Sequence, residues 1–357
     1  MFPSDLNHLM RLLYFFSLLF LLSCTSTPEK PKAKKPHPDL KRDTLQGSIR
    51  TQTQVNYIFI EDTLTKKTLQ QKAYELSITY DPQGYLIENS YQDDSLQEQT
   101  RFYYDEEHRV IVENYMHKSL KNNEIKMTLT HYQYDTLGYE VSRFRYDYSD
   151  SLPKVTRFDT EYDKDGNIQS VVKSVFEQND WQLSDREVYK YNTKGYEQEK
   201  ESYYYYRALW MLQEKKISRY EKDSLLVEKL FYNYKLHNLP SRVLYRYKGL
   251  LQEVTYINPK DSITSMVSFE YNPQGEITKY VEYTPEGFEK KRIFHLYTPF
   301  RERLEDVTYK NNTEDERTLY RYGVKGNLTE KITYRDQKIT SKTEVKYTYY
   351  EAIPPVK

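Results

Sequence analysis

Hydrophobic and polar residues alternate along most of this 357-residue chain. In residues 74–80 (YELSITY) every second side chain is aromatic or aliphatic, and the residues between them are polar. Segments 277–283 and 328–334 show a similar alternation. Because successive side chains of a strand point to opposite faces, this pattern predicts strands with one apolar face.

A tyrosine followed by a tight polar turn ends many of these segments and recurs along the chain. We call these residues the anchor tyrosines. They are Tyr80, Tyr134, Tyr162, Tyr191, Tyr271 and Tyr322 in the clearest copies, and Tyr104, Tyr220, Tyr247, Tyr297 and Tyr347 in weaker ones. Successive anchors are 24 to 30 residues apart. A period of this size predicts an array of one supersecondary unit.

The residues after each anchor favour a turn. Asp81, Asp135 and Asp163 each follow an anchor directly, and such a side chain can accept a hydrogen bond from the backbone two residues on. Glycine comes four residues after an anchor and supplies a positive φ. The glycines in this place are Gly84, Gly138, Gly166, Gly195, Gly275 and Gly326. A looser turn lies between anchors, so each period predicts a β-hairpin.

The predicted fold is all-β, a repeat-built antiparallel meander of hairpins over residues 47–353. We expect an elongated curved sheet or an open barrel, with polar terminal units at 47–60 and 341–353 as caps. Residues 203–216 (YYYYRALWMLQEKK) are the stretch that most resembles a helix, but their four tyrosines favour strand.

The turn motifs resemble the YD repeat of the Rhs family. The resemblance is carried best by 132–138 (YQYDTLG), 161–167 (EYDKDGN) and 320–328 (YRYGVKGNL), and covers about residues 75–350. It implies a spiralling antiparallel sheet that can wrap into a shell around a passenger. This chain is much shorter than shell-forming members and carries no passenger domain after the repeats. A closed shell around a toxin is therefore not expected.

The N-terminus has the features of a targeting segment. Arg11 precedes an apolar run at 12–22, which is too short to span a bilayer and fits a secretory signal over residues 1–23. The run ends at Cys24, the only cysteine, in a sequence that resembles the bacterial lipobox. The resemblance implies cleavage before Cys24 and its lipidation, which would anchor the chain stably.

Residues 24–46 then read as a disordered tether rich in proline and lysine, and 354–357 as a short tail. The lysines could instead contact anionic headgroups or the cell wall. By analogy with bacterial sorting, the threonine after Cys24 favours the outer membrane. Periplasmic-facing and surface-facing placements both stay open.

Composition narrows the function classes. The chain has 39 tyrosines, and its whole hydrophobic set is 38%, which predicts a thin structure with amphipathic aromatic faces and tyrosine hydroxyls in water. Its 53 basic and 53 acidic residues cancel, which argues against a nucleic-acid surface. The expected partners are the membrane, through the lipid anchor, and an envelope protein or glycan.

No catalytic, metal or cofactor site is predicted. A lipidated Cys24 cannot act as a nucleophile, and the seven histidines lack ligand spacing. Residues 163–167 (DKDGN) resemble the start of a calcium loop, but Ser174 replaces its acidic twelfth residue, and the turn interpretation is preferred.

Aromatic residues suggest one binding patch. It would comprise Tyr203, Tyr204, Tyr205, Tyr206 and Trp210, with Trp181 as a further anchor for stacking on sugars or peptides. The alternative is that most tyrosines simply ladder across strands and hold the sheet together.

Asp-Ser or Asp-Thr followed by an aliphatic residue resembles the O-glycosylation sequon of exported Bacteroidota proteins. The same dipeptides are also ordinary turn chemistry. The acceptors would be Thr44, Thr63, Ser95, Thr136, Ser151, Ser224 and Ser262.

These features predict a non-enzymatic envelope lipoprotein of a Gram-negative bacterium that offers a binding or scaffolding surface to a protein or glycan. One alternative, by family analogy, is a surface adhesin or an Rhs-type toxin-delivery accessory. Another is a glycan-active enzyme on a β-sheet platform, whose sign would be two carboxylates converging in a cleft.

Overall fold

The computed structural model describes residues 31–33, 39, 45–61, 65, 67–149 and 152–351. The predicted signal peptide, the predicted lipidation site Cys24, the acceptors Thr44, Thr63 and Ser151, and the tail at 354–357 lie outside these ranges. No helix in the described ranges is long and apolar enough to cross a membrane.

The described chain forms 22 strands. They are β1 (Ile49–Glu61), β2 (Thr68–Tyr80), β3 (Leu86–Asp93), β4 (Leu96–Tyr104), β5 (Val110–Ser119), β6 (Ile125–Tyr134), β7 (Glu140–Asp147), β8 (Lys154–Tyr162), β9 (Ile168–Glu177), β10 (Asp180–Tyr191), β11 (Glu197–Tyr206), β12 (Leu209–Glu221), β13 (Leu225–Asn233), β14 (His237–Lys248), β15 (Leu250–Ile257), β16 (Ile263–Tyr271), β17 (Ile277–Tyr283), β18 (Glu289–Tyr297), β19 (Arg303–Lys310), β20 (Thr313–Tyr322), β21 (Leu328–Arg335) and β22 (Lys338–Tyr349).

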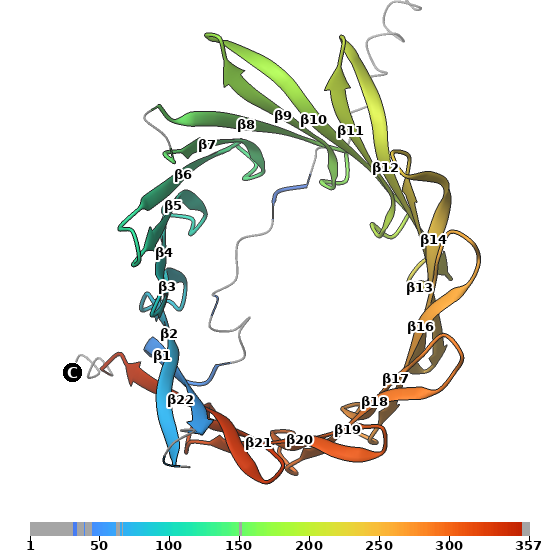
Figure 1. Cartoon of the computed structure of the whole chain (residues 1–357). Coiled ribbons are helices and arrows are strands. Elements are labelled where there is room, and N and C mark those ends of the chain that lie inside the picture. Colours follow the sequence, from blue (N-terminus) through green and yellow to red (C-terminus); the bar gives the residue numbers. More distant parts are fainter. Residues whose placement is uncertain are drawn as a thin grey trace, which may run out of the picture.

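Each strand pairs antiparallel with the next one in the sequence, so the all-β antiparallel meander is confirmed. The ends of the sheet, however, are not open. Strand β1 pairs antiparallel with β22, from Thr51 opposite Thr348 to Ile58 opposite Ser341, and the sheet closes into a ring (Figure 1). An even number of strands allows this antiparallel closure.

The expected open edge and polar end caps are therefore corrected. The segments 47–60 and 341–353 contain the two strands that pair with each other. The physical reason is that a free strand edge exposes unpaired N–H and C=O groups, and joining the two terminal strands satisfies both edges. The most buried apolar residues lie beside this seam, where Ile49 and Tyr80 pack with Leu45, Tyr347 and Tyr349.

The turns after the anchor tyrosines have the predicted construction. Asp81 Oδ1 accepts hydrogen bonds from the backbone N–H groups of Gln83 and Tyr85, both at 2.9 Å, and Gly84 has a φ of 92°. Asp163 makes the same two bonds to Asp165 and Asn167, which confirms the turn interpretation of that segment over a calcium loop. Equivalent bonds occur at Asp105, Asp135, Asn192 and Asn272. These turns form one rim of the ring, here called the anchor rim; the opposite one is the far rim.

The structure explains why a tyrosine stands at each anchor. The Tyr162 hydroxyl donates to the backbone carbonyl of Glu140 at 2.8 Å, in the strand that begins after the previous anchor turn. Seven anchors make this bond, and their hydroxyls therefore join neighbouring periods rather than pointing into water. They are Tyr104, Tyr134, Tyr162, Tyr220, Tyr271, Tyr297 and Tyr347.

A β-bulge accompanies this arrangement. The pairing register shifts at the anchor position in ten periods, for example between Glu161 and Tyr162. Bulges increase the local twist and bend of a strand, which is the shape change that curls a long sheet into a closed ring.

The anchor tyrosines lie on the inner face of the ring. The ring of Tyr139 packs on anchor Tyr162, with centroids 4.7 Å apart. The Tyr139 hydroxyl donates to the backbone carbonyl of Pro31 at 2.6 Å, and Figure 1 shows residues 31–33 inside the ring. Side chains that share the parity of an anchor, or lie opposite such a residue on the next strand, therefore face inward.

Residues 203–216 lie in strands and not in a helix, as predicted, with one turn between β11 and β12. Arg207 and Ala208 have φ values of 49° and 64°, and form a two-residue turn between β11 and β12. Two consecutive residues with positive φ are typical of a type I′ hairpin turn. The sequence lacks the Asn-Gly signal of such turns, so the four tyrosines before it dominated the prediction.

Candidate binding site on the inner face

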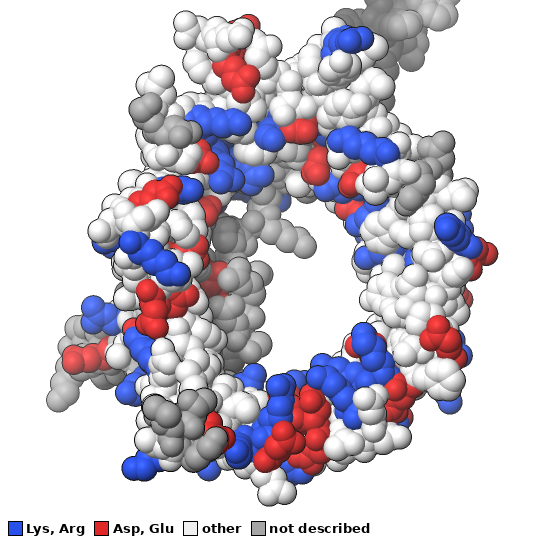
Figure 2. Space-filling view, in the orientation of Figure 1, with Lys and Arg blue, Asp and Glu red and all other residues white. Residues whose placement is uncertain are grey.

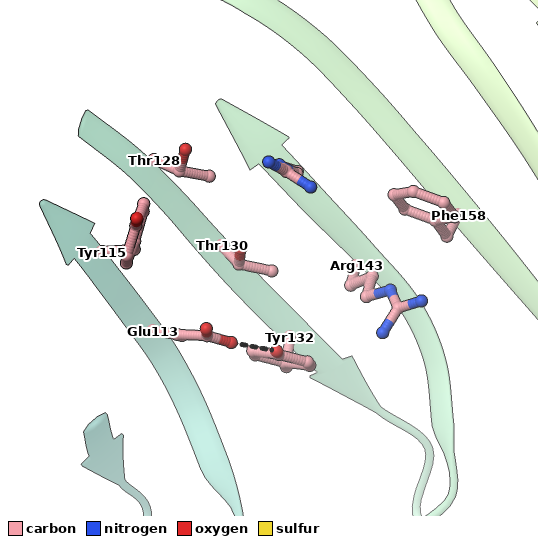
Figure 3. Close-up of a pocket in the computed structure, with 8 residues that line it drawn as sticks. Glu113, Tyr115, Thr128, Thr130, Tyr132, Arg143 and Phe158 are labelled. Carbon is pink, nitrogen blue, oxygen red and sulfur yellow. Dashed lines mark hydrogen bonds between the residues drawn. The ribbon is translucent and has the colours of Figure 1, made fainter. Parts of the chain in front are cut away.

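The inner face carries a depression of about 270 Å³ on strands β5 to β8. Figure 3 shows Thr128, Thr130 and Tyr132 along β6, with Arg143 on β7 and Phe158 on β8. The remaining lining residues are Glu113, Tyr115 and Arg145.

Strand register brings these side chains together. Thr130 lies opposite Glu113 on β5 and opposite Arg145 on β7. Two residues further along these strands, Arg143 lies opposite Tyr132 on β6 and Phe158 on β8. Because residues directly opposite each other share a face, four strands contribute one continuous inward-facing surface.

The tyrosines of the depression are protonated hydrogen-bond donors. The Tyr132 hydroxyl donates to Glu113 Oε2 at 2.8 Å, and burial together with this carboxylate raises the pKa of Tyr132. The Tyr115 hydroxyl donates to Glu98 Oε1 at 2.5 Å, and burial followed by that bond raises the pKa of Tyr115 to about 12. Both bonds fix the rings and leave their faces available for stacking.

The arginines supply an excess of positive charge. The Arg143 guanidinium carbon lies 4.6 Å from the ring centroid of Phe158, and Arg143 Nε is 3.8 Å from Glu140 Oε1. Arg145 is exposed and has no ion pair or hydrogen bond with any residue that the structure describes. The lining therefore offers planar donor groups beside aromatic faces, with Glu113 as its one carboxylate.

A second polar cluster lies on the inner face of β18 to β20. His295 Nδ1 is 2.5 Å from Asp306 Oδ1, and the Tyr320 hydroxyl donates to Asp306 Oδ2 at 2.7 Å. Burial opposes ionisation of Asp306, but its bonds from His295 and Tyr320 outweigh burial and lower its pKa. This carboxylate is thus saturated by its own neighbours. In the described ranges, no group of His, Cys, Asp and Glu side chains could hold a metal ion.

The outer face carries cross-strand ion pairs. Lys190 pairs with Glu199, and Arg246 Nη2 lies 2.6 Å from Glu253 Oε2. Similar pairs join Arg219 to Glu228, Glu270 to Lys279 and Arg321 to Glu330. In each of them the first residue directly precedes an anchor tyrosine. Figure 2 shows acidic and basic side chains spread over the wall, with a largely uncharged stretch where β13, β14 and β16 lie. Paired charges around an outer wall are typical of a water-facing surface, because a lipid-facing barrel wall presents an apolar band.

The predicted aromatic patch is split by strand alternation. Tyr205 lies opposite Trp210, and their ring centroids are 5.0 Å apart on the outer face. Tyr203 shares that face and donates to Glu201, whereas Tyr204 and Tyr206 share the inner face. The five residues thus surround one hairpin end rather than forming a single surface.

The described O-glycosylation candidates all lie in turns. Thr136, Ser224 and Ser262 are exposed, whereas Ser95 is half-buried. The Ser95 hydroxyl donates to Asp93 Oδ1 at 2.8 Å, as ordinary turn chemistry predicts. Their glycosylation stays a prediction.

The inner depression was missed by the sequence interpretation. Arg143 and Arg145 (SRFRY) sit in an alternating strand segment like many others. The sequence does show two arginines two residues apart, which places them on the same face of a strand. Their threonine and tyrosine neighbours lie on the adjacent strand, however, and can be identified only once the strand pairing is known.

Comparison with known proteins finds only distant structural similarity. No protein-family model matches the chain, and no curated protein matches it. Among solved structures, TcdB2-TccC3-Cdc42 is similar at 11% identity and a TM-score of 0.26. The match covers 75% of this chain and 22% of the chain in that structure. TcdB2-TccC3 without its hypervariable C-terminal region is similar at 12% identity and a TM-score of 0.25, with the same coverage.

A porin-like protein from Bacteroides uniformis is similar at 8% identity and a TM-score of 0.30, over 84% of this chain and 98% of that chain. Likeness at these identities does not extend to function. The YD-repeat resemblance therefore stays a prediction that depends on the turn motifs.

Proposed function

We propose that this protein is a non-enzymatic envelope lipoprotein whose inner wall binds an acidic glycan. The observation that supports this proposal best is the pair Arg143 and Arg145 in an aromatic-lined depression where Arg145 has no carboxylate partner among the described residues. A guanidinium binds a sugar carboxylate through two parallel hydrogen bonds, which gives both charge and orientation.

The rest of the lining suits a saccharide. Tyr132 and Phe158 offer ring faces to the apolar side of a sugar, and Thr128 and Thr130 offer hydroxyl groups. Glu113 is already held by Tyr132 and can accept a further bond from a sugar hydroxyl. The ring surrounds a wide central opening, through which a long polymer would reach this wall (Figure 2).

The attachment to the envelope is proposed through Cys24. Pro31, which lies at the anchor rim, is seven positions after Cys24, and a segment of that length spans at most about 25 Å. The lipid would thus hold the anchor rim towards the membrane. Metabolic labelling with a palmitate analogue tests this, since a Cys24→Ala variant should lose both the label and membrane fractionation.

Calorimetric titration of the mature chain with a uronic-acid trisaccharide and its neutral counterpart tests the binding proposal. We expect the acidic sugar to bind and the Arg145→Gln variant to bind at least about tenfold more weakly, since a charged hydrogen bond contributes about 1.5–3 kcal/mol. Arg246→Gln is the matched control, because it removes an arginine of the outer face. Equal binding of both sugars, or equal loss in both variants, would contradict the proposal.

A further inference from the structure

The hairpins β9–β10 and β11–β12 separate at their far-rim ends, where Figure 1 shows them splayed apart. Pairing between β10 and β11 ends at Asp185 opposite Tyr204. Within each hairpin it continues to the tip, to Asp180 opposite Glu177 and to Tyr206 opposite Leu209. Residues 180–184 and 205–206 therefore face each other without a strand partner on that side in the described part of the chain. We call this opening the fork.

Both hairpins carry a bulge beside the fork. The register of β10 against β9 shifts between Leu183 and Asp185, and the register of β11 against β12 shifts between Ser202 and Tyr203. Each bulge adds local twist to its own hairpin. A similar shift in β15, between Tyr256 and Ile257, leaves that strand paired with β14, so the bulges contribute to the opening but do not determine it.

A cleft of about 340 Å³ lies in the fork. It is lined by Val175, Glu177, Gln182, Leu183, Ser184, Asp185, Tyr204 and Tyr205. Free edges of two strands present rows of backbone N–H and C=O groups at fixed spacing. The group that satisfies such rows is another extended polypeptide backbone.

The two faces of the fork differ in chemistry. On the outer face, Trp181 and Leu183 lie on the β10 side, and Tyr205 with Trp210 on the other side. On the inner face the edges carry Gln182 and Tyr206, and Tyr204 lies in the last pair before the fork. A strand placed between the hairpins would therefore have apolar or aromatic side chains outward and polar side chains inward, in strict alternation.

Charge at the hairpin tip adds a further requirement. Glu177 lies directly opposite Asp180, both are exposed, and neither has a cationic partner among the described residues. Like charges directly opposite on neighbouring strands repel each other. A lysine or arginine at the end of the incoming strand would relieve that repulsion.

We propose that the fork binds an extended segment of a partner protein as an added β-strand. The segment alternates apolar and polar residues over about five positions and carries a basic residue beside the β9–β10 tip. This site is separate from the glycan site on β5–β8 and does not depend on it.

The test is selection of a displayed library of 12-residue peptides against the mature full-length chain. We expect enriched peptides with the alternating pattern and a terminal Lys or Arg. Leu183→Glu should weaken their binding at least tenfold. Met127→Glu should leave it unchanged, because Met127 is equally exposed (40% against 41%) on the outer face of β6, away from the fork, and its carbonyl already accepts a hydrogen bond from the Tyr148 backbone N–H. Bound peptide should also slow amide exchange at 180–184 and 205–206.

Three outcomes would overturn the proposal. The first is a selection that yields no peptide dependent on Leu183. The second is equal loss of binding in Leu183→Glu and Met127→Glu. The third is a concentration-dependent dimer of the chain that Leu183→Glu abolishes, which would make a second copy the occupant. Binding of the acidic trisaccharide should be the same in Leu183→Glu and the parent protein, so failure here is distinguishable from failure of the glycan proposal.

Discussion

Removing the hydroxyl of one anchor tyrosine should destabilise the ring measurably. In Tyr162→Phe the bond to the Glu140 carbonyl, 2.8 Å in length, is lost while the aromatic ring remains. Burial raises the pKa of Tyr162 to about 12, so the hydroxyl is a neutral donor at any pH near 7. The substitution therefore removes this hydrogen bond between neighbouring periods and keeps the ring in place.

The expected cost follows from the burial of that bond. A net contribution of about 1 kcal/mol is typical, and a half-buried carbonyl left without its donor adds up to about 1 kcal/mol more. With a urea m-value of roughly 3 kcal/mol/M for a chain of this size, the unfolding midpoint should fall by about 0.5 M. Urea unfolding followed by tyrosine fluorescence and circular dichroism measures this shift.

Tyr148→Phe is the control, because Tyr148 is an exposed tyrosine of the far rim whose hydroxyl makes no hydrogen bond with any residue that the structure describes. Its midpoint should change little. If Tyr162→Phe unfolds at the same urea concentration as the parent protein or as Tyr148→Phe, the hydroxyl does not join periods energetically, and the reasoning about anchors is wrong.

Three further outcomes follow from local geometry. Hydrogen bonds from the Ser95 backbone, the Ser95 hydroxyl and the Leu96 backbone lower the pKa of Asp93 to about 2. The ionised Asp93 should therefore stabilise the fold fully above about pH 4, and this stabilisation should be lost as the pH falls through about 2. In an acid titration of the free energy of unfolding, Asp93→Asn should lack this pH-dependent loss. Gly166→Ala should destabilise more than Gly287→Ala in thermal unfolding, because both glycines have positive φ but only the Gly166 Cβ would meet the Tyr139 hydroxyl; equal melting temperatures would contradict this. Val345→Asp should lower stability by about 3 kcal/mol, since this seam residue is 5% exposed and an unpaired buried charge is costly; a loss below about 1 kcal/mol, measured by urea unfolding, would show that the seam is open in solution.

Local features of the fold were predictable because they depend on residues close in sequence. Alternation around Tyr80 and the Asp-to-Gly turn at 81–84 act within one hairpin, so periodicity and turn chemistry were sufficient. Closure of the ring depends on pairing between Thr51 in β1 and Thr348 in β22. No residue pattern within either strand shows whether its outer edge pairs with another strand or faces water. The sequence interpretation therefore treated both strands as caps.

The candidate site was less predictable than the fold. Arg143 becomes notable only when Tyr132 and Phe158 are known to be its cross-strand neighbours. The fork is defined by the point where pairing between β10 and β11 stops, and no residue pattern near Asp185 or Tyr204 marks that point as clearly as a glycine marks a turn. Sequence did indicate the aromatic residues of 203–210, but it could not divide them between two faces.

The seam also has a consequence for how the chain matures. All other pairings join strands adjacent in sequence, so the sheet can grow one hairpin at a time as the chain is synthesised. The β1 edge that will meet β22 must wait until about 290 more residues have been made, and a waiting strand edge invites association with other chains. The first half of β1 (IRTQTQVN) is rich in glutamine, threonine and asparagine. This polar composition disfavours such association, and makes β1 the segment for which a chaperone would matter most.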